Sequence, residues 1–195
     1  MEKLNGKKRL KVCVFISGRG TNLKSLIKFS QKKNSKIKIS LVVSNNKKAK
    51  GLVIAKKYKI KCLIVNYLNK NKAEDKILTN LKKNNINFIC LAGFMKIISK
   101  KIINKYSGKI LNIHPSLLPK YKGLDTHKRV IMNKEKFSGC TIHLVNPKLD
   151  SGKIILQKKI KVLKNDDEKS LAKRLIKIEN ELYPIALKKF LSTNL

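Results

Sequence analysis

Residues suited to acyl transfer gather in one part of the chain. The three histidines, His114, His127 and His143, all fall within a stretch of 30 residues. Asn112 comes two residues before His114, and Asp150 comes seven residues after His143. An Asn amide can donate hydrogen bonds to a developing oxyanion, a His exchanges protons near neutral pH, and an Asp orients and stabilises an imidazolium. The pattern therefore predicts Asn112, His114 and Asp150 as catalytic residues for acyl transfer.

Other interpretations of these residues remain open at this point. The three histidines could hold zinc, although no H-E-x-x-H or paired Cys/His spacing supports a metal site. A serine hydrolase would need the G-x-S-x-G elbow, which the chain lacks. His143 falls inside a predicted strand and fits a hydrogen-bonded residue that supports the site. Asp150 precedes Ser151 and Gly152, which is also the pattern of a plain turn.

A glycine-rich turn near the start of the chain is a candidate phosphate site. The segment 17–22, Ser-Gly-Arg-Gly-Thr-Asn, follows an apolar run and precedes residues at helical spacing. Gly18 and Gly20 permit a tight backbone, and the next helix offers free N–H groups at its positive end. The turn is neither a dinucleotide fingerprint, because residue 23 is Leu, nor a Walker motif. It predicts a monophosphate site, with an ordinary strand-to-helix turn as the alternative.

The elements that must position these residues alternate along the first 113 residues. Buried strands are expected at 10–16, 37–43, 61–65, 86–92 and 109–113. Helices are expected after residue 21 and at 48–58, 72–83 and 95–106. This alternation is typical of a parallel sheet with helices on both faces. Such sheets place their sites at the carboxyl ends of the strands.

The pattern changes after residue 114. A short helix near 126–133, strands at 140–145 and 153–162, and a long helix beginning near 165–168 are expected. Pro184 should kink or divide this last helix. Without an internal repeat or linker, one domain over 1–195 is predicted, with the phosphate turn in 9–108 and the catalytic residues in 88–195. The predicted fold class is α/β, a mostly parallel twisted sheet flanked by helices, with antiparallel strands and a long helix near the end.

The net charge of +36 suggests nucleic acid, but the kind of basic residue argues against a specific reader. The chain has 47 Lys and Arg against 11 Asp and Glu, and only 4 of the basic residues are Arg. Arg is the better reader of bases and phosphates. The longest basic run is Lys7-Lys8-Arg9, and Ile and Asn, which share A/T-rich codons with Lys, are also abundant. We interpret the charge as a solvated lysine surface that attracts polyanions only non-specifically.

Compartment and partners follow from composition. The chain is 42% hydrophobic, which suits a packed core, and contains no apolar run of membrane-spanning length. Its first ten residues lack the apolar core of a signal peptide. Four cysteines lie singly among apolar residues and are expected to be reduced and structural. We predict a cytoplasmic protein with no membrane partner and no specific nucleic acid.

Four motifs resemble, in order and spacing, those of the phosphoribosylglycinamide formyltransferases. They are Ser17-Gly18-Arg19-Gly20-Thr21-Asn22-Leu23, Leu91-Ala92-Gly93-Phe94-Met95, Asn112-Ile113-His114-Pro115-Ser116-Leu117-Leu118-Pro119 and Leu149-Asp150-Ser151-Gly152. The resemblance covers roughly 9–190. It implies a Rossmann-like formyltransferase fold and transfer of a formyl group from 10-formyltetrahydrofolate to the amine of 5′-phosphoribosylglycinamide, in purine biosynthesis and without a metal.

The resemblance also implies roles for the catalytic residues. Asn112 would hold the formyl oxygen as charge develops on it. His114 would lie beside it as proton carrier or electrostatic stabiliser. Asp150 would pair with His114 and order a water that relays the proton from the amine to the folate nitrogen.

Binding residues are implied in the same way. Glu179 matches a carboxylate that contacts the glycinamide substrate. The ribose phosphate would lie against Gly18, Gly20, Thr21 and Asn22. The folate would lie against Met95, Lys96, Ile97, Ile98, Asn112 and Asp150.

The chain departs from the family at Asp125, which replaces a frequent histidine, and related activities stay as alternatives. A formyltransferase for methionyl-tRNA would suit the charge but carries a second RNA-binding barrel, which we do not expect here because the sequence ends at Leu195. A deformylase usually has an N-terminal module, and a nucleotide-sugar formyltransferase would share the core chemistry. A non-catalytic polyanion-binding protein would explain the lysines but not the cluster of Asn112, His114 and Asp150. A monomer or homodimer is expected.

Overall fold

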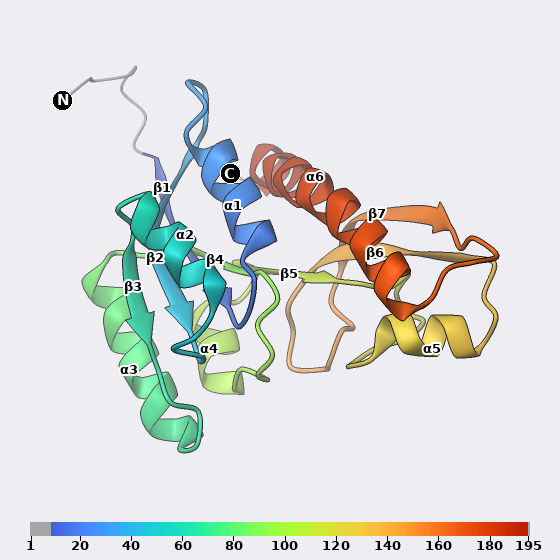
Figure 1. The fold of residues 1–195 in the computed structure, drawn as a ribbon. Helices are drawn as coiled ribbons and strands as arrows, with labels where there is room; N and C mark the ends of the chain where they lie inside the picture. Colours follow the sequence, from blue (N-terminus) through green and yellow to red (C-terminus); the bar gives the residue numbers. More distant parts are fainter. Residues whose placement is uncertain (1–8, 195) are drawn as a thin grey trace.

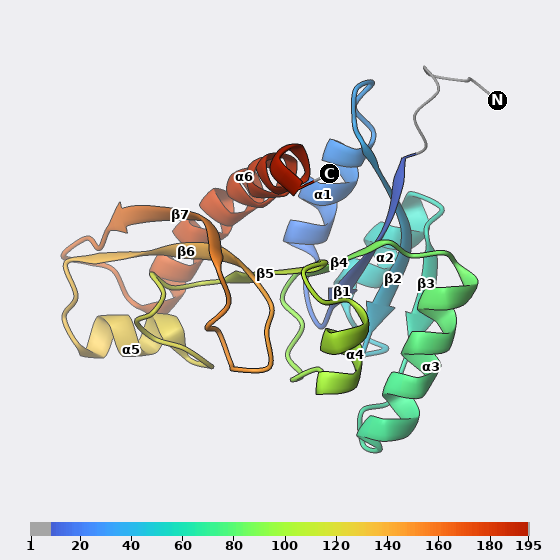
Figure 2. The same ribbon diagram turned by 180° about the vertical axis from the view of Figure 1, so that it is seen from behind.

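A seven-stranded sheet forms the centre of the structure, a computed structural model that describes residues 9–194 (Figures 1 and 2). The strands are β1 (Leu10–Ile16), β2 (Ile37–Ser44), β3 (Lys61–Ile64), β4 (Phe88–Leu91), β5 (Ile110–His114), β6 (Phe137–Leu144) and β7 (Ile154–Lys161). Their order across the sheet is β3-β2-β1-β4-β5-β6-β7. The pairs β5–β6 and β6–β7 are antiparallel, and the other pairs are parallel. The predicted fold class is confirmed.

Residues 1–8 and 195 lie outside the described part of the chain. The start of the basic run, Lys7 and Lys8, and most of the segment considered for a signal peptide lie there as well. Among the described residues, no helix combines the length and the apolar character needed to cross a bilayer.

The position of each strand in the sheet agrees with its sequence. β1 lies in the interior and is an almost continuous apolar run, buried from Val12 to Ile16. Parallel strands covered on both faces are apolar throughout for this reason. β7 lies at the edge and carries Lys158, Lys159 and Lys161. Lysines on an edge strand discourage pairing with another sheet.

Helices cover both faces of the sheet (Figures 1 and 2). They are α1 (Thr21–Ser30), α2 (Lys50–Lys57), α3 (Lys70–Lys83), α4 (Lys100–Lys105), α5 (Thr126–Met132) and α6 (Glu168–Asn194). α1, α2 and α6 pack into one core cluster with the sheet, whereas α3 and α4 pack into a second cluster on the other face. α5 packs against the first turns of α6.

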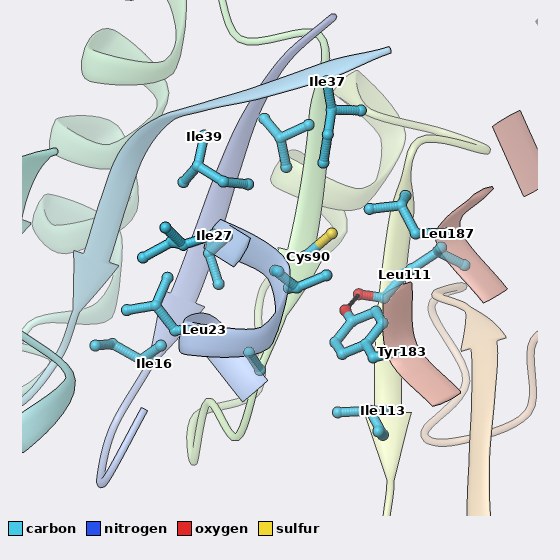
Figure 3. Packing of buried hydrophobic residues seen from close by; sticks show 14 of the residues in the cluster. Ile16, Leu23, Ile27, Ile37, Ile39, Cys90, Leu111, Ile113, Tyr183 and Leu187 are labelled. Atoms are coloured by element: carbon cyan, nitrogen blue, oxygen red, sulfur yellow. Dashed lines mark hydrogen bonds between the residues drawn. The ribbon is translucent and has the colours of Figure 1, made fainter. Parts of the chain in front are cut away.

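The larger core lies between the sheet and helices α1 and α6 (Figure 3). Leu111 and Ile113 of β5 lie beside Tyr183 and Leu187 of α6, and all four side chains are buried. The Tyr183 hydroxyl lies 3.1 Å from Leu91 O and 3.0 Å from Leu111 O. This hydroxyl ties α6 to β4 and β5 just before the residues of the candidate site.

Two sequence predictions about helices were wrong in part. The helix expected over 95–106 begins only at Lys100, because Gly93 adopts a left-handed backbone and Glu74 accepts the Ser99 N–H. Pro184 does not divide the last helix, since α6 is one element of 27 residues with the proline inside it. Burial of Tyr183 and its neighbours against the sheet holds the chain helical on both sides of the proline. Most other boundaries differ from the predicted ones by a few residues.

The cysteines agree with the expectation of unpaired thiols. Cys13, Cys90 and Cys140 are free and buried, and Cys62 is free and half-buried. Burial raises the pKa of Cys90 and of Cys140 to about 12. Both thiols are therefore protonated at neutral pH and act as small apolar groups.

Tyr183→Phe should lower the free energy of unfolding by about 1–3 kcal/mol, because the one hydroxyl hydrogen shared between the carbonyls of Leu91 and Leu111 is lost. Chemical denaturation measures the loss. Tyr106→Phe is the matched control, since its buried hydroxyl makes one longer bond of 3.3 Å to Ile86 O, and we expect a smaller loss. Equal losses would contradict the role given to the link between α6 and the carbonyls of Leu91 and Leu111.

Candidate active site

The alternation of β5 places Asn112 and His114 on one face of the sheet. Leu111 and Ile113 are buried in the core under α6, so Asn112 and His114 point to the opposite face. On that face the antiparallel strand β6 brings His143 into register with Asn112. The three residues therefore meet where the last parallel strand pairs with the first antiparallel strand.

His143 orients the amide of Asn112. His143 Nδ1 lies 2.8 Å from Leu144 O, which can only accept, so this ring nitrogen carries the hydrogen. The other ring nitrogen, Nε2, then accepts a hydrogen bond of 3.2 Å from Asn112 Nδ2. The amide keeps a second hydrogen that can donate to an oxygen in the site. The His143 side chain is 2% exposed.

Asp150 lies between two imidazole rings. Its Oδ2 is 3.4 Å from His114 Nδ1, and its Oδ1 is 3.6 Å from His143 Nε2. The backbone N–H of Gly123 donates a 2.9 Å hydrogen bond to Oδ2. The carboxylate is 9% exposed, which is low for an acid. The structure thus brings Asn112 and His114, both of β5, together with Asp150 from the loop between β6 and β7.

The loop that carries Asp150 presses closely against β6. Asp150 itself has a left-handed backbone, with φ of 44°. A Cβ atom on Gly152 would lie 1.8 Å from Leu144 O, so only glycine permits this approach. The glycine of the Asp-Ser-Gly motif therefore sets how near the carboxylate comes to His143.

The charge state of Asp150 follows from its surroundings. Burial raises its pKa, but the hydrogen bond from the Gly123 N–H and the positive charge of the nearby histidines when protonated lower it by more, so the pKa lies below its ordinary value. The group is ionised at neutral pH. An ionised carboxylate in this position can stabilise a protonated imidazole beside it.

His114 is arranged to receive a proton on Nδ1. Its Nε2 lies 2.8 Å from Tyr121 O and donates to that carbonyl, so the neutral ring presents the Nδ1 lone pair toward Asp150. Burial lowers the pKa of His114, and the Tyr121 carbonyl and Asp150 offset this only in part. The ring is therefore neutral near pH 7, and Asp150 would stabilise a proton that arrives at Nδ1.

His127 lies outside the hydrogen-bonded cluster. It occupies the first turn of α5, half-buried, and its buried Nδ1 has no hydrogen-bond partner among the described residues. In the described part of the chain, no group of three or more His, Cys, Asp or Glu side chains could hold a metal ion. Asp125, the departure from the family, precedes α5 with an exposed side chain and no capping hydrogen bond from it.

The glycine turn has the shape of an anion site. α1 begins at Thr21 with neither a side-chain cap nor an acidic residue in its first turn, so its N–H groups face outward. Gly20 has a φ of 76°, and a Cβ there would lie 2.5 Å from Gly51 Cα. The Gly51 N–H also donates to Gly18 O at 3.0 Å. The start of α2 therefore holds the turn in place.

Asn22 links this turn to α6. Its Nδ2 donates a 2.8 Å hydrogen bond to Glu179 Oε2, and both residues are buried. Burial raises the pKa of Glu179, with the Asn22 bond acting in the other direction. Asn22 Oδ1 is buried without a partner among the described residues. Glu179 therefore lies beside the turn, whereas none of the described contacts joins it to Asn112, His114 or Asp150.

The segment expected to line the folate pocket is only partly exposed. Met95 and Ile97 are 62% and 68% exposed, and Lys96 is exposed as well. Ile98 is 5% exposed and packs into the second core cluster, so its side chain anchors the segment.

Several groups at the site were not predicted from the sequence. Tyr121 and Gly123 act through their backbones, on His114 and Asp150, and a backbone contact leaves no mark in residue type. Ser17 bonds to the segment after β4, although the sequence showed it only as the first residue of the turn. Glu74 is 2% exposed, and its helical spacing with Ile77 and Leu81 was the available signal for its burial.

Comparison with known families agrees with this geometry. The family described as Formyl transferase matches residues 10–187. The chain belongs to the formyl transferase family. The motif resemblance is thereby confirmed.

Individual relatives of this formyl transferase extend the match. Phosphoribosylglycinamide formyltransferase of Haemophilus influenzae is 39% identical over 183 residues, covering 92% of this chain and 86% of that protein. The human trifunctional purine biosynthetic protein adenosine-3 is 39% identical over 184 residues, and this chain spans 18% of its length. The crystal structure of phosphoribosylglycinamide formyltransferase from Brucella melitensis superposes with a TM-score of 0.89 at 41% identity, covering 94% of this chain and 96% of that one.

Gly20→Ala should lower the free energy of unfolding by more than the strain of a left-handed backbone alone would. Gly108 also has a positive φ, of 67°, but no atom lies within 4 Å of a Cβ placed there. Gly108→Ala should therefore lose about 1–2 kcal/mol from backbone strain only. Gly20→Ala adds the clash with Gly51, worth a further 1–3 kcal/mol or so. Urea unfolding of both variants measures the difference, and equal losses would show that the turn does not need the close approach.

Buried histidines make the stability of the formyl transferase depend on pH. Burial lowers the pKa of His127 and of His114. Between the lowered pKa and the ordinary value near 6.5, the unfolded chain binds more protons, so the free energy of unfolding rises with pH. His127→Gln should reduce this slope in the pH range just below 6.5, by at most about 1.4 kcal/mol per pH unit.

Urea unfolding at a series of pH values measures this slope. Lys128→Gln, a change at the exposed neighbour of His127, is the control and should leave the slope unchanged. An unchanged slope in His127→Gln would show that this ring titrates alike in the folded and unfolded chains.

Proposed function

We propose that the chain transfers the formyl group of 10-formyltetrahydrofolate to the amine of 5′-phosphoribosylglycinamide, giving formylglycinamide ribonucleotide and tetrahydrofolate in purine biosynthesis. One observation carries the proposal: a buried carboxylate, Asp150, lies against His114 beside the amide of Asn112, at the end of β5. The names of the relatives with high coverage on both chains agree with this activity.

The three residues supply what the transfer requires. A bond forms between the amine nitrogen and the formyl carbon, and the bond from that carbon to the folate nitrogen breaks. Negative charge develops on the formyl oxygen, and the free hydrogen of Asn112 Nδ2 is the donor for it. The amine loses a proton and the folate nitrogen gains one, so the proton is conserved. Asp150 and His114 form the pair that would hold the proton during this exchange.

The rest of the site suits the two substrates. The open start of α1 offers N–H groups and a positive dipole end to the ribose phosphate at Gly18, Gly20, Thr21 and Asn22. Glu179, held by Asn22, is a hydrogen-bond acceptor for the glycinamide part. Met95 and Ile97 offer exposed apolar surface to the pterin, with Lys96 between them. Together they favour a small phosphorylated amine over a transfer RNA.

The remaining parts of the proposal concern the setting of the reaction. We propose that the enzyme works in the cytoplasm as a monomer or homodimer and without a metal. The free thiols of Cys13, Cys62, Cys90 and Cys140 fit a reducing compartment. The proton-holding pair needs no Lewis acid to carry out the exchange described above.

Asp150→Asn should lower the turnover of this formyl transfer by about 100-fold or more, because the amide can neither hold the proton nor stabilise a charged His114. The measurement is the steady-state rate at which purified protein converts 10-formyltetrahydrofolate to tetrahydrofolate in the presence of phosphoribosylglycinamide, with a chelator added. Circular dichroism checks that the variant is folded.

Asp125→Asn is the matched control, an exposed Asp beside the site that should keep wild-type turnover. A wild-type protein that leaves the folate unchanged would contradict the proposed function. Full activity in Asp150→Asn, with an active wild type, would contradict the role of the carboxylate alone.

A further inference from the structure

Ser17 occupies the point where three strand ends meet. It follows β1 directly, and β1 lies between β2 and β4 in the sheet. Its neighbours are therefore the segments that leave β2, at Asn45 and Asn46, and the segment that leaves β4, at 93–95. The next residue along the chain, Gly18, begins the phosphate turn.

Every polar group of Ser17 bonds to one of these two segments. Its hydroxyl donates to Asn45 Oδ1 at 2.5 Å and accepts the Met95 N–H at 2.7 Å. Its backbone N–H donates to Gly93 O at 3.1 Å, and its carbonyl accepts from Asn46 Nδ2 at 3.2 Å. The single hydroxyl hydrogen is used on Asn45, so the oxygen is aimed at Met95 as an acceptor.

The segment after β4 has no regular structure of its own between β4 and α4. It is held at its two ends. At one end Ser17 accepts the Met95 N–H, and at the other Glu74 Oε1 accepts the Ser99 N–H at 2.8 Å. Between these two bonds, Met95 and Ile97 present their side chains to solvent while Ile98 is buried. The position of the exposed face therefore depends on the two anchoring hydrogen bonds.

We propose that Ser17 is a positioning residue that couples the two substrate sites. The inference rests on the proposed function, because it takes the turn at 18–22 as the phosphate site and the segment 95–98 as the pterin site. A phosphate bound at the turn fixes the backbone next to Ser17. The hydrogen bond from the Met95 N–H to the Ser17 hydroxyl then restricts the position of Met95. The pterin site is then ordered before the folate arrives.

Such a link must act equally in both directions. If the phosphate-bearing substrate raises the affinity for folate by some factor, folate raises the affinity for that substrate by the same factor. Loss of the hydroxyl removes one acceptor and one donor between rigid strand ends, so the two sites should bind independently. A residue with a structural role only would weaken both sites without changing this factor.

The experiment is calorimetric titration of the full chain with tetrahydrofolate, with and without saturating phosphoribosylglycinamide. The ratio of the two dissociation constants is the coupling factor. We expect about fivefold or more in the wild type, in the range common for coupled sites. Ser17→Ala should bring the factor close to one, and Ser17→Thr, which keeps the hydroxyl, should retain most of it.

Two further variants make the result independent of folding defects. Ser30→Ala removes a serine hydroxyl that, within residues 9–194, donates to Ile27 O at the far end of α1, and should leave the factor unchanged. Asn45→Ala keeps Ser17 but removes the acceptor that orients its hydroxyl, and should lower the factor even if Ser17→Ala does not fold.

The outcomes separate this inference from the proposed function. Coupling that persists in both Ser17→Ala and Asn45→Ala would overturn the inference. Binding of both ligands to the wild type with no coupling would also overturn it, while the proposed function stands. If the wild type binds neither ligand and transfers no formyl group, the proposed function itself fails.

Discussion

The Asp150 carboxylate lies against two imidazole rings and one backbone N–H, and much of the second half of the structure keeps it there. A nearly buried carboxylate is costly unless its oxygens are satisfied. The Gly123 N–H supplies one definite hydrogen bond, and Gly152 lets the loop approach β6 closely enough for His143 to lie beside the other oxygen. The ionised carboxylate lies 3.4 Å from Nδ1 of His114.

The two faces of the sheet differ at β5, since one packs into the core and the other carries the candidate site. On one face, Leu111 and Ile113 pack under α6 and fix β5, while on the other the same strand presents Asn112 and His114. The carboxyl ends of β1 and β4 meet beside the glycine turn, where the strand order changes direction. Open α/β sheets bind ligands at such a point because backbone loops diverge there and leave room between them.

The positions of the few acidic residues affect how the large positive charge is interpreted. Glu74, Asp150 and Glu179 are largely buried, and each accepts an N–H group, from Ser99, Gly123 and Asn22 respectively. Each of these carboxylates thereby links two segments that are distant in the chain. The exposed ion pairs Lys101–Asp75 and Lys120–Glu135 are of the kind that contributes little to stability. A lysine-rich surface would still draw anionic substrates toward the site.

The sequence by itself determined the alternating strands and helices, the glycine turn, and the three catalytic candidates, because each depends on local periodicity or on rare residue types. It did not determine where the segment after β4 becomes helical, since a buried Glu74 from α3 decides that. It also did not show that Pro184 lies within one continuous helix, because packing of α6 on the sheet outweighs the local effect of proline. Only the tertiary structure decided the roles of Tyr121, Gly123 and Ser17. Gly123 and Ser17 bond to segments distant in the chain, and Tyr121 bonds back to His114 across the loop after β5, so these contacts exist only in the folded chain.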